Sequence, residues 1–335
     1  MTTDGAPRRP LRATIIGAGL MGRWHAHALT HAGHTVVAVV DSNLDRAATI
    51  ARTHSGARAS ATLAESSEAD VVHVCTPLGS HVGIALEAIA RGAHVIVEKP
   101  LASSPDETSR VLDRALAAGV LVVPVHQFPF QRGVVEALKS MQAIGKVLHV
   151  DFTACTAGAA GSSDAEQDRV ALEVLPHPMS LLAQLVSPSI TDVAWSVSHT
   201  RPGELRTHGV LGGASVSVVI STHGRPTTNQ MRIIGEHGTI AIDLYHGFSV
   251  TTHGRATRAG KVTQPFVNAA SQFGAAAGNL ARRAAAREPA YPGLRELVRA
   301  FYDAVIDGKP APISPKETMA VANAVASVEQ LMERA

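Results

Sequence analysis

Apolar positions in the first third of the chain follow two alternating patterns. Short aliphatic runs, such as Val95, Ile96 and Val97, are typical of strands that are buried on both faces of a sheet. Longer stretches with apolar residues at helical spacing lie between these runs. Strands that alternate with helices predict a parallel sheet with right-handed crossovers. We place strands within 13–19, 35–41, 69–77, 94–100 and 121–125, and helices within 20–33, 42–55, 81–92 and 106–120.

The pattern changes after residue 149. Alternating or β-rich runs are separated there by turn residues, and the segment GEHGT at 235–239 predicts a hairpin turn. We interpret the Ala-rich, basic stretch 269–288 as a solvated surface helix rather than a membrane-facing one, because no large apolar anchors line it. We therefore expect two domains, 1–125 and 126–335. The β-rich runs cover 149–158, 192–200, 213–224, 229–245 and 246–254, and closing helices cover 292–306 and 315–334.

The composition is that of a globular protein and argues against several functions. Of 335 residues, 45% are hydrophobic and 17% are charged; the net charge is +2 and the arginines are scattered, which gives nucleic-acid binding no support. The longest apolar runs have the length of strands, so we expect no membrane span. The basic N-terminus leads into a strand rather than a signal peptide, and two cysteines favour a reducing cytoplasm without disulfides. His25 and His27 do not share a helix face, so we predict no metal site.

A glycine-rich turn follows the first predicted strand. Gly17, Gly19 and Gly22 have the spacing G-x-G-x-x-G, with Leu20 and Met21 inside it, and a predicted helix begins there. This context is the dinucleotide-binding fingerprint. The first glycine allows the tight turn, the second lets the pyrophosphate approach the backbone, and the third lets helix pack on strand, while the helix N-terminus donates N–H groups to the phosphates. We therefore predict that these residues hold a dinucleotide.

Asp41 ends the second predicted strand, where a carboxylate accepts hydrogen bonds from an adenosine ribose. The ribose 2′-phosphate of NADP would be repelled by this carboxylate and attracted by an arginine. Ser42 and Asn43 come next and neither is basic, although Arg23 and Arg46 are near in sequence. The sequence favours NAD as the cofactor over NADP.

The aliphatic strand at 94–97 ends abruptly in Glu98, Lys99 and Pro100. Ligands bind at the carboxyl ends of strands in an open α/β sheet, so Lys99 is a candidate to contact one. The alternative is a surface lysine whose charged end reaches into water.

Three segments together resemble the family of glucose–fructose oxidoreductase, inositol 2-dehydrogenase and rhizopine-catabolism MocA proteins (Gfo/Idh/MocA). They are IIGAGLMGRWHAHAL with the later Asp41, VCTPLGSHVGIALEAIARGAHVIVEKPLA, and ALEVLPHPMSLLAQL. The resemblance implies an α/β Rossmann domain with a parallel sheet, then an α+β domain with a large, mostly antiparallel open sheet. It also implies that Lys99 lies beside the nicotinamide and hydrogen-bonds the substrate oxygen, where a cation stabilises developing charge, while Glu98 orients the loop.

The same resemblance places further residues along the cofactor. Thr76 and Pro77 would lie beside it, and His81, at the start of the next helix, would lie near the nicotinamide. Gln127 follows another predicted strand and would contact the substrate or the nicotinamide ribose; a simple loop role is the alternative. Substrate specificity is expected in loops of the second domain that include 156–172.

A histidine of the second domain is the implied acid–base group. The family supplies a D-x-x-x-H segment, and the matching residues here are Glu173 and His177, so aspartate has become glutamate. Pro176 and Pro178 flank the histidine, and because proline is tolerated in the first helical turn, we expect a helix to begin near Pro176 with Glu173 just before it. A helix N-terminus disfavours imidazolium, which keeps His177 neutral unless Glu173 compensates. The alternative is a histidine that only packs between domains.

The leading interpretation is an NAD-dependent oxidoreductase that acts on a secondary alcohol or ketone of a sugar, cyclitol or sugar derivative. His177 would exchange the hydroxyl proton and Lys99 would polarise the oxygen. A lyase- or glycosidase-type enzyme that uses retained NAD transiently, and a non-catalytic NAD-binding sensor, remain alternatives. Residues 213–222 carry more apolar positions than one buried sheet face needs, which predicts a homodimer or homotetramer joined through that sheet, unless helices within 269–306 cover it.

Overall fold

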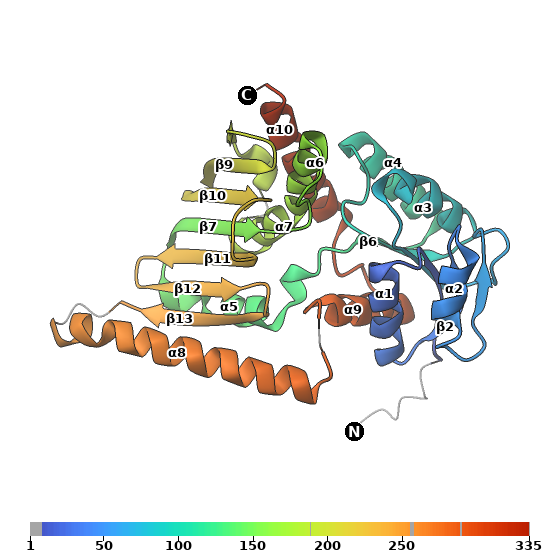
Figure 1. The fold of residues 1–335 in the computed structure, drawn as a ribbon, viewed down its shortest axis with the longest axis horizontal. Coiled ribbons are helices and arrows are strands. Elements are labelled where there is room, and N and C mark those ends of the chain that lie inside the picture. The colour runs from blue at the N-terminus through green and yellow to red at the C-terminus, as the bar shows by residue number, and fades with distance from the viewer. Residues whose placement is uncertain (1–8, 188, 255–257, 289, 335) are drawn as a thin grey trace. The chain divides into compact units, whose positions relative to one another are not determined.

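The chain folds into two compact units, seen in a computed structural model that describes residues 9–334 except 188, 255–257 and 289 (Figure 1). Residues 1–8, the start of the basic N-terminus that we expected to lead into a strand rather than to be a signal peptide, lie outside the described part. The first unit comprises Met1–Val125 and Leu294–Met319, and the second comprises His126–Gly293 and Ala320–Ala335.

The expected second domain, 126–335, is therefore interrupted by a segment that belongs to the first unit. This segment contains α9 (Leu294–Asp307), which packs against α1 (Leu20–His31). Its apolar side chains, among them Leu297 and Phe301, are fully buried. Burial of this apolar stripe explains why the segment returns to the first unit.

A six-stranded parallel sheet forms the centre of the first unit, as the alternating pattern predicted. Its strand order is β3-β2-β1-β4-β5-β6, so the order reverses between β1 and β4. β5 pairs with β4 and β6, and Val95, Ile96 and Val97 are all fully buried, so both faces of the sheet are covered at this strand. The strands are β1 (Arg12–Ile16), β2 (Thr35–Val40), β3 (Arg58–Ser60), β4 (Val71–Val74), β5 (His94–Val97) and β6 (Val122–Pro124), and the other helices are α2 (Leu44–Ala51), η1 (Leu78–Ser80), α3 (His81–Ala90) and α4 (Pro105–Ala118).

The second unit is built on a seven-stranded sheet with the order β13-β12-β11-β7-β10-β9-β8. Only the pairing of β7 with β10 is parallel, so the expectation of a large, mostly antiparallel sheet is confirmed. The strands are β7 (Val147–Cys155), β8 (Ser196–His199), β9 (Glu204–Leu211), β10 (Ala214–Ser221), β11 (Thr228–Gly235), β12 (Gly238–Asp243) and β13 (Phe248–His253). The helices are η2 (Phe128–Phe130), α5 (Arg132–Ser140), η3 (Met141–Ile144), α6 (Asp164–Val174), α7 (Pro176–Leu185), η4 (Ile190–Asp192), α8 (Arg258–Ala285) and α10 (Pro315–Met332), of which α10 contributes its residues from 320 onward.

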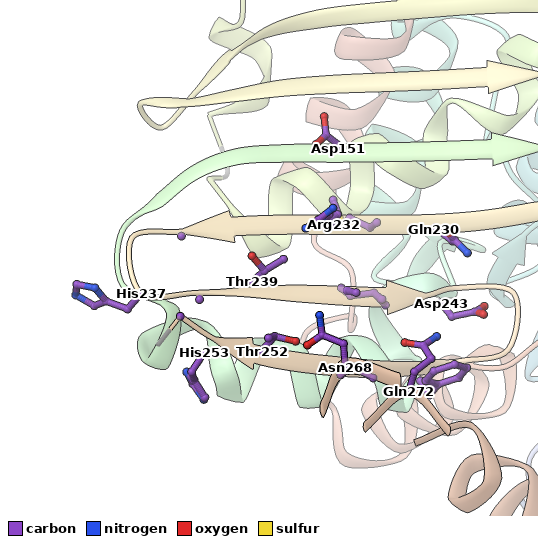
Figure 2. A pocket seen from close by; sticks show the side chains of 18 of the residues that line it. Asp151, Gln230, Arg232, His237, Thr239, Asp243, Thr252, His253, Asn268 and Gln272 are labelled. Atoms are coloured by element: carbon purple, nitrogen blue, oxygen red, sulfur yellow. The ribbon is translucent and has the colours of Figure 1, made fainter. Parts of the chain in front are cut away.

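The two faces of this sheet differ in polarity, and the expected apolar outer face is wrong. Val216, Val218 and Ile220 of β10 point inward and are buried in the core of the unit. The residues between them point outward, and only Val219 among them is apolar. The strict alternation of a strand therefore sends the aliphatic side chains of 213–222 to one face. Figure 2 shows polar side chains on the outer face instead, including Asp151 and Arg232.

A cavity of about 900 Å³ lies on this outer face, between the strands and α8 (Figure 2). Its lining includes polar side chains of the sheet and Gln264, Asn268 and Gln272 of α8. None of the residues that we predicted for the functional site lines it. The polar side of α8 thus faces the sheet.

Helix α8 is longer than the predicted stretch 269–288, because it begins at Arg258. Phe273 and Leu280 are exposed within the predicted stretch, and Val262 and Phe266 are exposed in the added turns, so the premise that no large apolar side chains line 269–288 is wrong. Among the described residues, no helix combines the length and the apolar character that crossing a membrane requires.

Candidate functional site

The glycine turn between β1 and α1 has the close contacts that the fingerprint predicts. Gly17 adopts a φ of +95°, and a Cβ there would lie 2.5 Å from the carbonyl oxygen of Cys75. A Cβ on Gly22 would lie 1.9 Å from the carbonyl oxygen of Gly17, so only glycine lets the helix pack on the turn. At Gly19, by contrast, an added Cβ would meet no atom within 4 Å. This open space leaves room for a ligand to approach the backbone.

The N-terminus of α1 has no side-chain cap. Gly19 is the N-cap residue, and the first turn contains no acidic side chain. The uncapped N–H groups and the helix dipole favour an anion at this end. Leu20 is exposed and Met21 is half-buried, so both flank the turn as predicted residues of the site.

Asp41 directly follows β2 and binds the glycine turn. Its Oδ2 accepts the N–H of Ala18 at 2.8 Å, and its Oδ1 accepts the N–H of Asn43 at 2.8 Å. Asn43 in turn caps α2 by accepting the N–H of Arg46 at 3.2 Å. The carboxylate is therefore fixed beside the turn, and each oxygen keeps a lone pair for another donor.

These features fit a dinucleotide. The open space at Gly19 and the uncapped N–H groups of α1 suit a pyrophosphate, and the fixed Asp41 carboxylate suits a ribose hydroxyl. All of them lie where the strand order reverses at β1, which is the ligand-binding position of open α/β sheets.

Lys99 follows β5 at the same edge of the sheet, because the carboxyl ends of parallel strands lie together. The buried Glu98 accepts the backbone N–H of Lys99 with its Oε2 at 3.2 Å. His81 reaches the same turn: its Nδ1 lies 2.9 Å from the carbonyl oxygen of Pro100, and its Nε2 lies 2.8 Å from that of Thr76. The loops after β4 and β5 are thereby tied together.

The other residues predicted after β4 have distinct environments. Pro77 is exposed and Thr76 is half-buried, with its Oγ1 accepting a hydrogen bond from Ser80 at 2.8 Å. His81 is buried, and both of its ring nitrogens face carbonyl oxygens. Its ring therefore holds the two loops, whereas Thr76 and Pro77 form the accessible rim.

A chain of buried polar groups leads from Glu98 into the first unit. Glu98 Oε1 lies 3.1 Å from His25 Nε2, His25 Nδ1 lies 2.8 Å from His73 Nδ1, and His73 Nε2 lies 2.8 Å from the Tyr302 hydroxyl. An ionised carboxylate only accepts, so His25 carries its proton on Nε2. With both imidazoles neutral, each remaining bond has one possible direction: Tyr302 donates to His73, and His73 donates to His25.

Burial controls the protonation of these groups. Burial lowers the pKa of His73 well below its usual value, and the neighbouring His25 and His34 lower it further. Burial also raises the pKa of Tyr302, so the hydroxyl keeps its proton. For Glu98, burial is the largest influence and raises the pKa, but the hydrogen bond from His25 and the positive charge of Lys99 outweigh it and hold the pKa below its usual value. Glu98 therefore remains a carboxylate that orients the backbone of Lys99.

The predicted residues of the second unit surround the start of α7. This helix begins at Pro176, as the proline pattern predicted, and places His177 in its first turn. The buried His177 ring stacks on Phe128, with ring centroids 4.2 Å apart and planes inclined by 22°. Gln127, next to Phe128, is buried, and its side-chain oxygen has no hydrogen-bond partner among the described residues. A buried oxygen without a partner is suited to accept a hydrogen bond from a ligand.

Glu173 lies in the last turn of α6 and is paired with Arg169, which also pairs with Glu166. The backbone at Leu175 stays in the right-handed helical region, with φ −57° and ψ −35°. Glu173 and His177 are four residues apart on this nearly continuous helical path, so they lie on one side of it. The segment 156–172, expected as a loop, is helical from Asp164 onward.

Sequence reasoning missed three residues of this arrangement. His73 and Tyr302 are separated by 229 positions, and neither belongs to a recognisable motif. Phe128 was overlooked because it reads as an ordinary apolar residue. One signal in the sequence could have indicated His73: it lies within the valine-rich strand β4, and a histidine buried in such a strand needs a polar partner.

The comparisons with known sequences agree with this geometry. The oxidoreductase family profile "GFO_IDH_MocA", described as an NAD-binding Rossmann fold, matches residues 11–126. Inositol 2-dehydrogenase 4 of Saccharopolyspora erythraea is 37% identical over 122 residues, which are 35% of this chain and 36% of that protein. The chain thus aligns with about a third of that relative. A scyllo-inositol 2-dehydrogenase (NADP(+)) of Bacillus subtilis is 26% identical over 254 residues, covering 70% of this chain and 77% of that protein.

Solved structures show the same fold over nearly the whole chain. Levoglucosan dehydrogenase, in complex with NADH and levoglucosan, matches with a TM-score of 0.76 at 18% identity and covers 97% of this chain and 98% of that one. A UDP-N-acetylglucosamine 3-dehydrogenase from Acidithiobacillus ferrooxidans matches with a TM-score of 0.72 at 18% identity, covering 97% and 99%. Residues 11–126 therefore match the NAD-binding Rossmann domain of the Gfo/Idh/MocA oxidoreductases, and the whole chain has the fold of the solved dehydrogenases.

Proposed function

We propose that the protein is an NAD-dependent oxidoreductase that interconverts a secondary alcohol and a ketone on a sugar, a cyclitol or a sugar derivative. The observation that carries the proposal is the fixed Lys99 turn, which follows β5 at the sheet edge that also carries the glycine turn. The names of the relatives support the substrate class, since they include inositol dehydrogenases and a D-glucoside 3-dehydrogenase.

The proposed chemistry divides between two side chains. NAD, when bound, supplies the acceptor for the hydride. Lys99 stabilises the charge that develops on the substrate oxygen, and a preorganised cation acts strongly at such a position because it needs no reorganisation. Glu98 holds the backbone of Lys99, and His25 holds Glu98. The two loops after β4 and β5 keep their geometry through His81.

His177 exchanges the hydroxyl proton in this proposal. Its position in the first turn of α7 and its stacking on Phe128 support a fixed ring orientation. Glu173, paired with Arg169 one helical turn earlier, contributes a negative charge on the same side of the helix. Gln127 is proposed to accept a hydrogen bond from substrate or cofactor through its unpaired oxygen.

NAD is the proposed cofactor because the Asp41 carboxylate is fixed and negatively charged where the ribose of the adenosine would bind. Asp41→Ala should weaken NADH binding by about tenfold or more, since hydrogen bonds to charged groups contribute about 1.5–3 kcal/mol. Adding Ser42→Arg should then favour NADPH. Fluorescence titration measures both affinities, and Asp45→Ala, which removes an exposed acid of α2, is the matched control. Tighter binding of NADPH than of NADH to the wild-type protein would contradict this role of Asp41.

The activity itself is tested by incubating the protein with NAD and a panel of sugars, sugar acids, cyclitols and nucleotide sugars. The proposal predicts that free NADH accumulates with at least one class. Turnover of a substrate without any accumulation of NADH would indicate the lyase- or glycosidase-type alternative. Tight NADH binding without turnover of any compound would indicate a sensor.

We also propose that the protein is a homo-oligomer. The support does not come from the sheet face, which is polar, but from the exposed apolar side chains of α8.

A further inference from the structure

Helix α8 exposes an apolar stripe along most of its length. Val262, Phe266, Phe273 and Leu280 are each more than 70% exposed. They belong to a small set of large apolar side chains that the described part of the chain leaves in water, and no other helix or strand of it exposes so many. Isolated exposed apolar residues are normal in proteins, but a contiguous stripe of this kind indicates an interaction surface.

The stripe lies on the side of α8 that faces away from the rest of the second unit. Gln264, Asn268 and Gln272 face the cavity over the sheet. Asn279 continues this inner side, since its side chain donates a hydrogen bond to the carbonyl oxygen of His246 at 2.9 Å. At about 100° per residue, the exposed phenylalanines lie roughly opposite to these positions. The described residues of the second unit therefore leave the stripe uncovered.

The spacing of the stripe is that of a helix made to pair with another helix. Phe266, Phe273 and Leu280 are seven residues apart, and Val262 with Ala269 and Ala276 fills the intermediate positions of a heptad pattern. The pattern is also symmetric, because Phe266 and Leu280 are equally far from Phe273. A twofold axis at Phe273 would place Phe266 of one helix opposite Leu280 of an antiparallel partner.

We propose that α8 is a self-association surface, which pairs antiparallel with α8 of a second copy of this chain about a twofold axis at Phe273. A closed twofold contact of this kind uses the same patch on both copies and leaves no apolar surface to extend into a filament. The surface is distinct from the sheet face, since the stripe and the cavity lining occupy opposite sides of the helix.

The stripe supplies most of the area that such a contact needs. Each exposed phenylalanine offers on the order of 150 Å² and the smaller side chains less, so the stripe would remove roughly 600 Å² from water on each copy. Stable interfaces bury about 800 Å² per partner, so the stripe supplies roughly three quarters of that area. The antiparallel arrangement also opposes the two helix dipoles.

The charges favour a second copy over a lipid surface. Residues 262–281 contain no charged side chain, so two copies meet here without repulsion. An interfacial membrane helix requires lysines and arginines along the flanks of its apolar face to bind anionic headgroups. In α8, Arg282 and Arg283 are instead directed to Glu288, and Arg283 also to the carbonyl oxygen of His246.

The oligomeric state of the purified chain tests the proposal. Light scattering coupled to gel filtration should show a dimer or a multiple of it at micromolar concentration. Phe273→Glu should shift the mass to half that of the wild type, whereas Leu116→Glu, which changes an equally exposed residue of α4, should leave the mass unchanged. Both variants should keep the circular dichroism and NADH affinity of the wild type, because both positions are on the surface. A monomeric wild type, or a dimer that survives Phe273→Glu, would overturn the proposal.

Cross-linking tests the antiparallel geometry without disturbing the fold. In a background with Cys75→Ala and Cys155→Ser, the variant Phe273→Cys should form an intermolecular disulfide under mild oxidation, because the axis brings the two residues together. Phe266→Cys alone should not, since its antiparallel neighbour is Leu280. A cross-link through Cys at 266 but not at 273 would contradict the proposed axis. Cosedimentation of a monomeric wild type with vesicles of phosphatidylcholine and phosphatidylserine would assign the stripe to lipid instead.

Discussion

Replacing His73 and Tyr302, separately and together, tests the buried chain that holds Glu98. Tyr302→Phe removes the only donor that the chain assigns to His73 Nε2 and leaves that nitrogen buried. His73→Phe leaves two groups without partners, the Tyr302 hydroxyl and His25 Nδ1. A buried unsatisfied polar group costs about 1–3 kcal/mol, so we expect losses of about 1–2 kcal/mol for the first variant and about 2–4 kcal/mol for the second.

The double variant should be less destabilised than the sum of the single variants. With both partners apolar, only His25 Nδ1 remains without a donor, so the double variant should lose about 1–2 kcal/mol, which is about 2–4 kcal/mol less than the sum of the single variants. Urea denaturation measures the free energy of unfolding, and Trp24 fluorescence in a Trp195→Phe background reports the first unit. Strictly additive losses would refute the hydrogen-bond chain.

The same variants have a predictable pH dependence. Burial lowers the pKa of His73 in the folded state. Below about pH 6.5 the unfolded chain therefore binds a proton on His73 that the native state does not bind, so the free energy of unfolding decreases as the pH falls. Between pH 7.5 and 5.5 this one group removes at most about 1.4 kcal/mol. His73→Phe should lose that much less over the interval than the wild type, while His54→Gln, at a half-buried histidine elsewhere, should change the slope less. An unchanged slope in His73→Phe would show that His73 is not the buried neutral group described.

Two further pairs of substitutions test the turn and the sheet. Gly22→Ala should abolish NADH binding and destabilise the first unit, because its Cβ would lie 1.9 Å from a carbonyl oxygen, whereas Gly19→Ala should fold normally and weaken only NADH binding, as calorimetry would measure. Val218→Asp should unfold the second unit, because that side chain is fully buried, whereas the outward-facing Val219→Asp should shift the melting temperature little. Equal effects within either pair would contradict the assigned geometry.

Most of the fold was predictable because local patterns carried it. The aliphatic strands of the first unit are buried on both faces, so each appears in the sequence as a continuous apolar run. β9 was missed for the opposite reason: its inward positions include Thr207 and Gly209, so the alternation of apolar and polar residues is not visible. Gly209 is required there, since a Cβ would lie 2.5 Å from the Val193 side chain, a contact that no local pattern reveals.

The site was predictable to the extent that motifs define it. The glycine spacing and Asp41 identified the turn, and the proline pair identified the start of α7. The groups that hold Glu98 were not predictable, because His73 and Tyr302 meet only after α9 returns to the first unit. The exposed apolar surface was likewise predicted on β10, whereas it lies on α8. The prediction summed the apolar residues of β10 without separating alternate positions, which face opposite sides of the sheet.

The most direct test of the central claim is the transfer of hydrogen from substrate carbon to the nicotinamide. The protein is incubated with NAD and with polyols and sugars that carry deuterium on their hydroxyl-bearing carbons, and the cofactor is then analysed by mass spectrometry. The account predicts one deuterium in the nicotinamide ring of NADH with the wild type, and incorporation about a hundredfold slower with Lys99→Met, since loss of one charge-stabilising group typically has that effect. NADH affinity should change far less than the rate. Demonstrated binding of NAD without deuterium in the cofactor for any substrate, or equal rates for the wild type and Lys99→Met, would contradict the account.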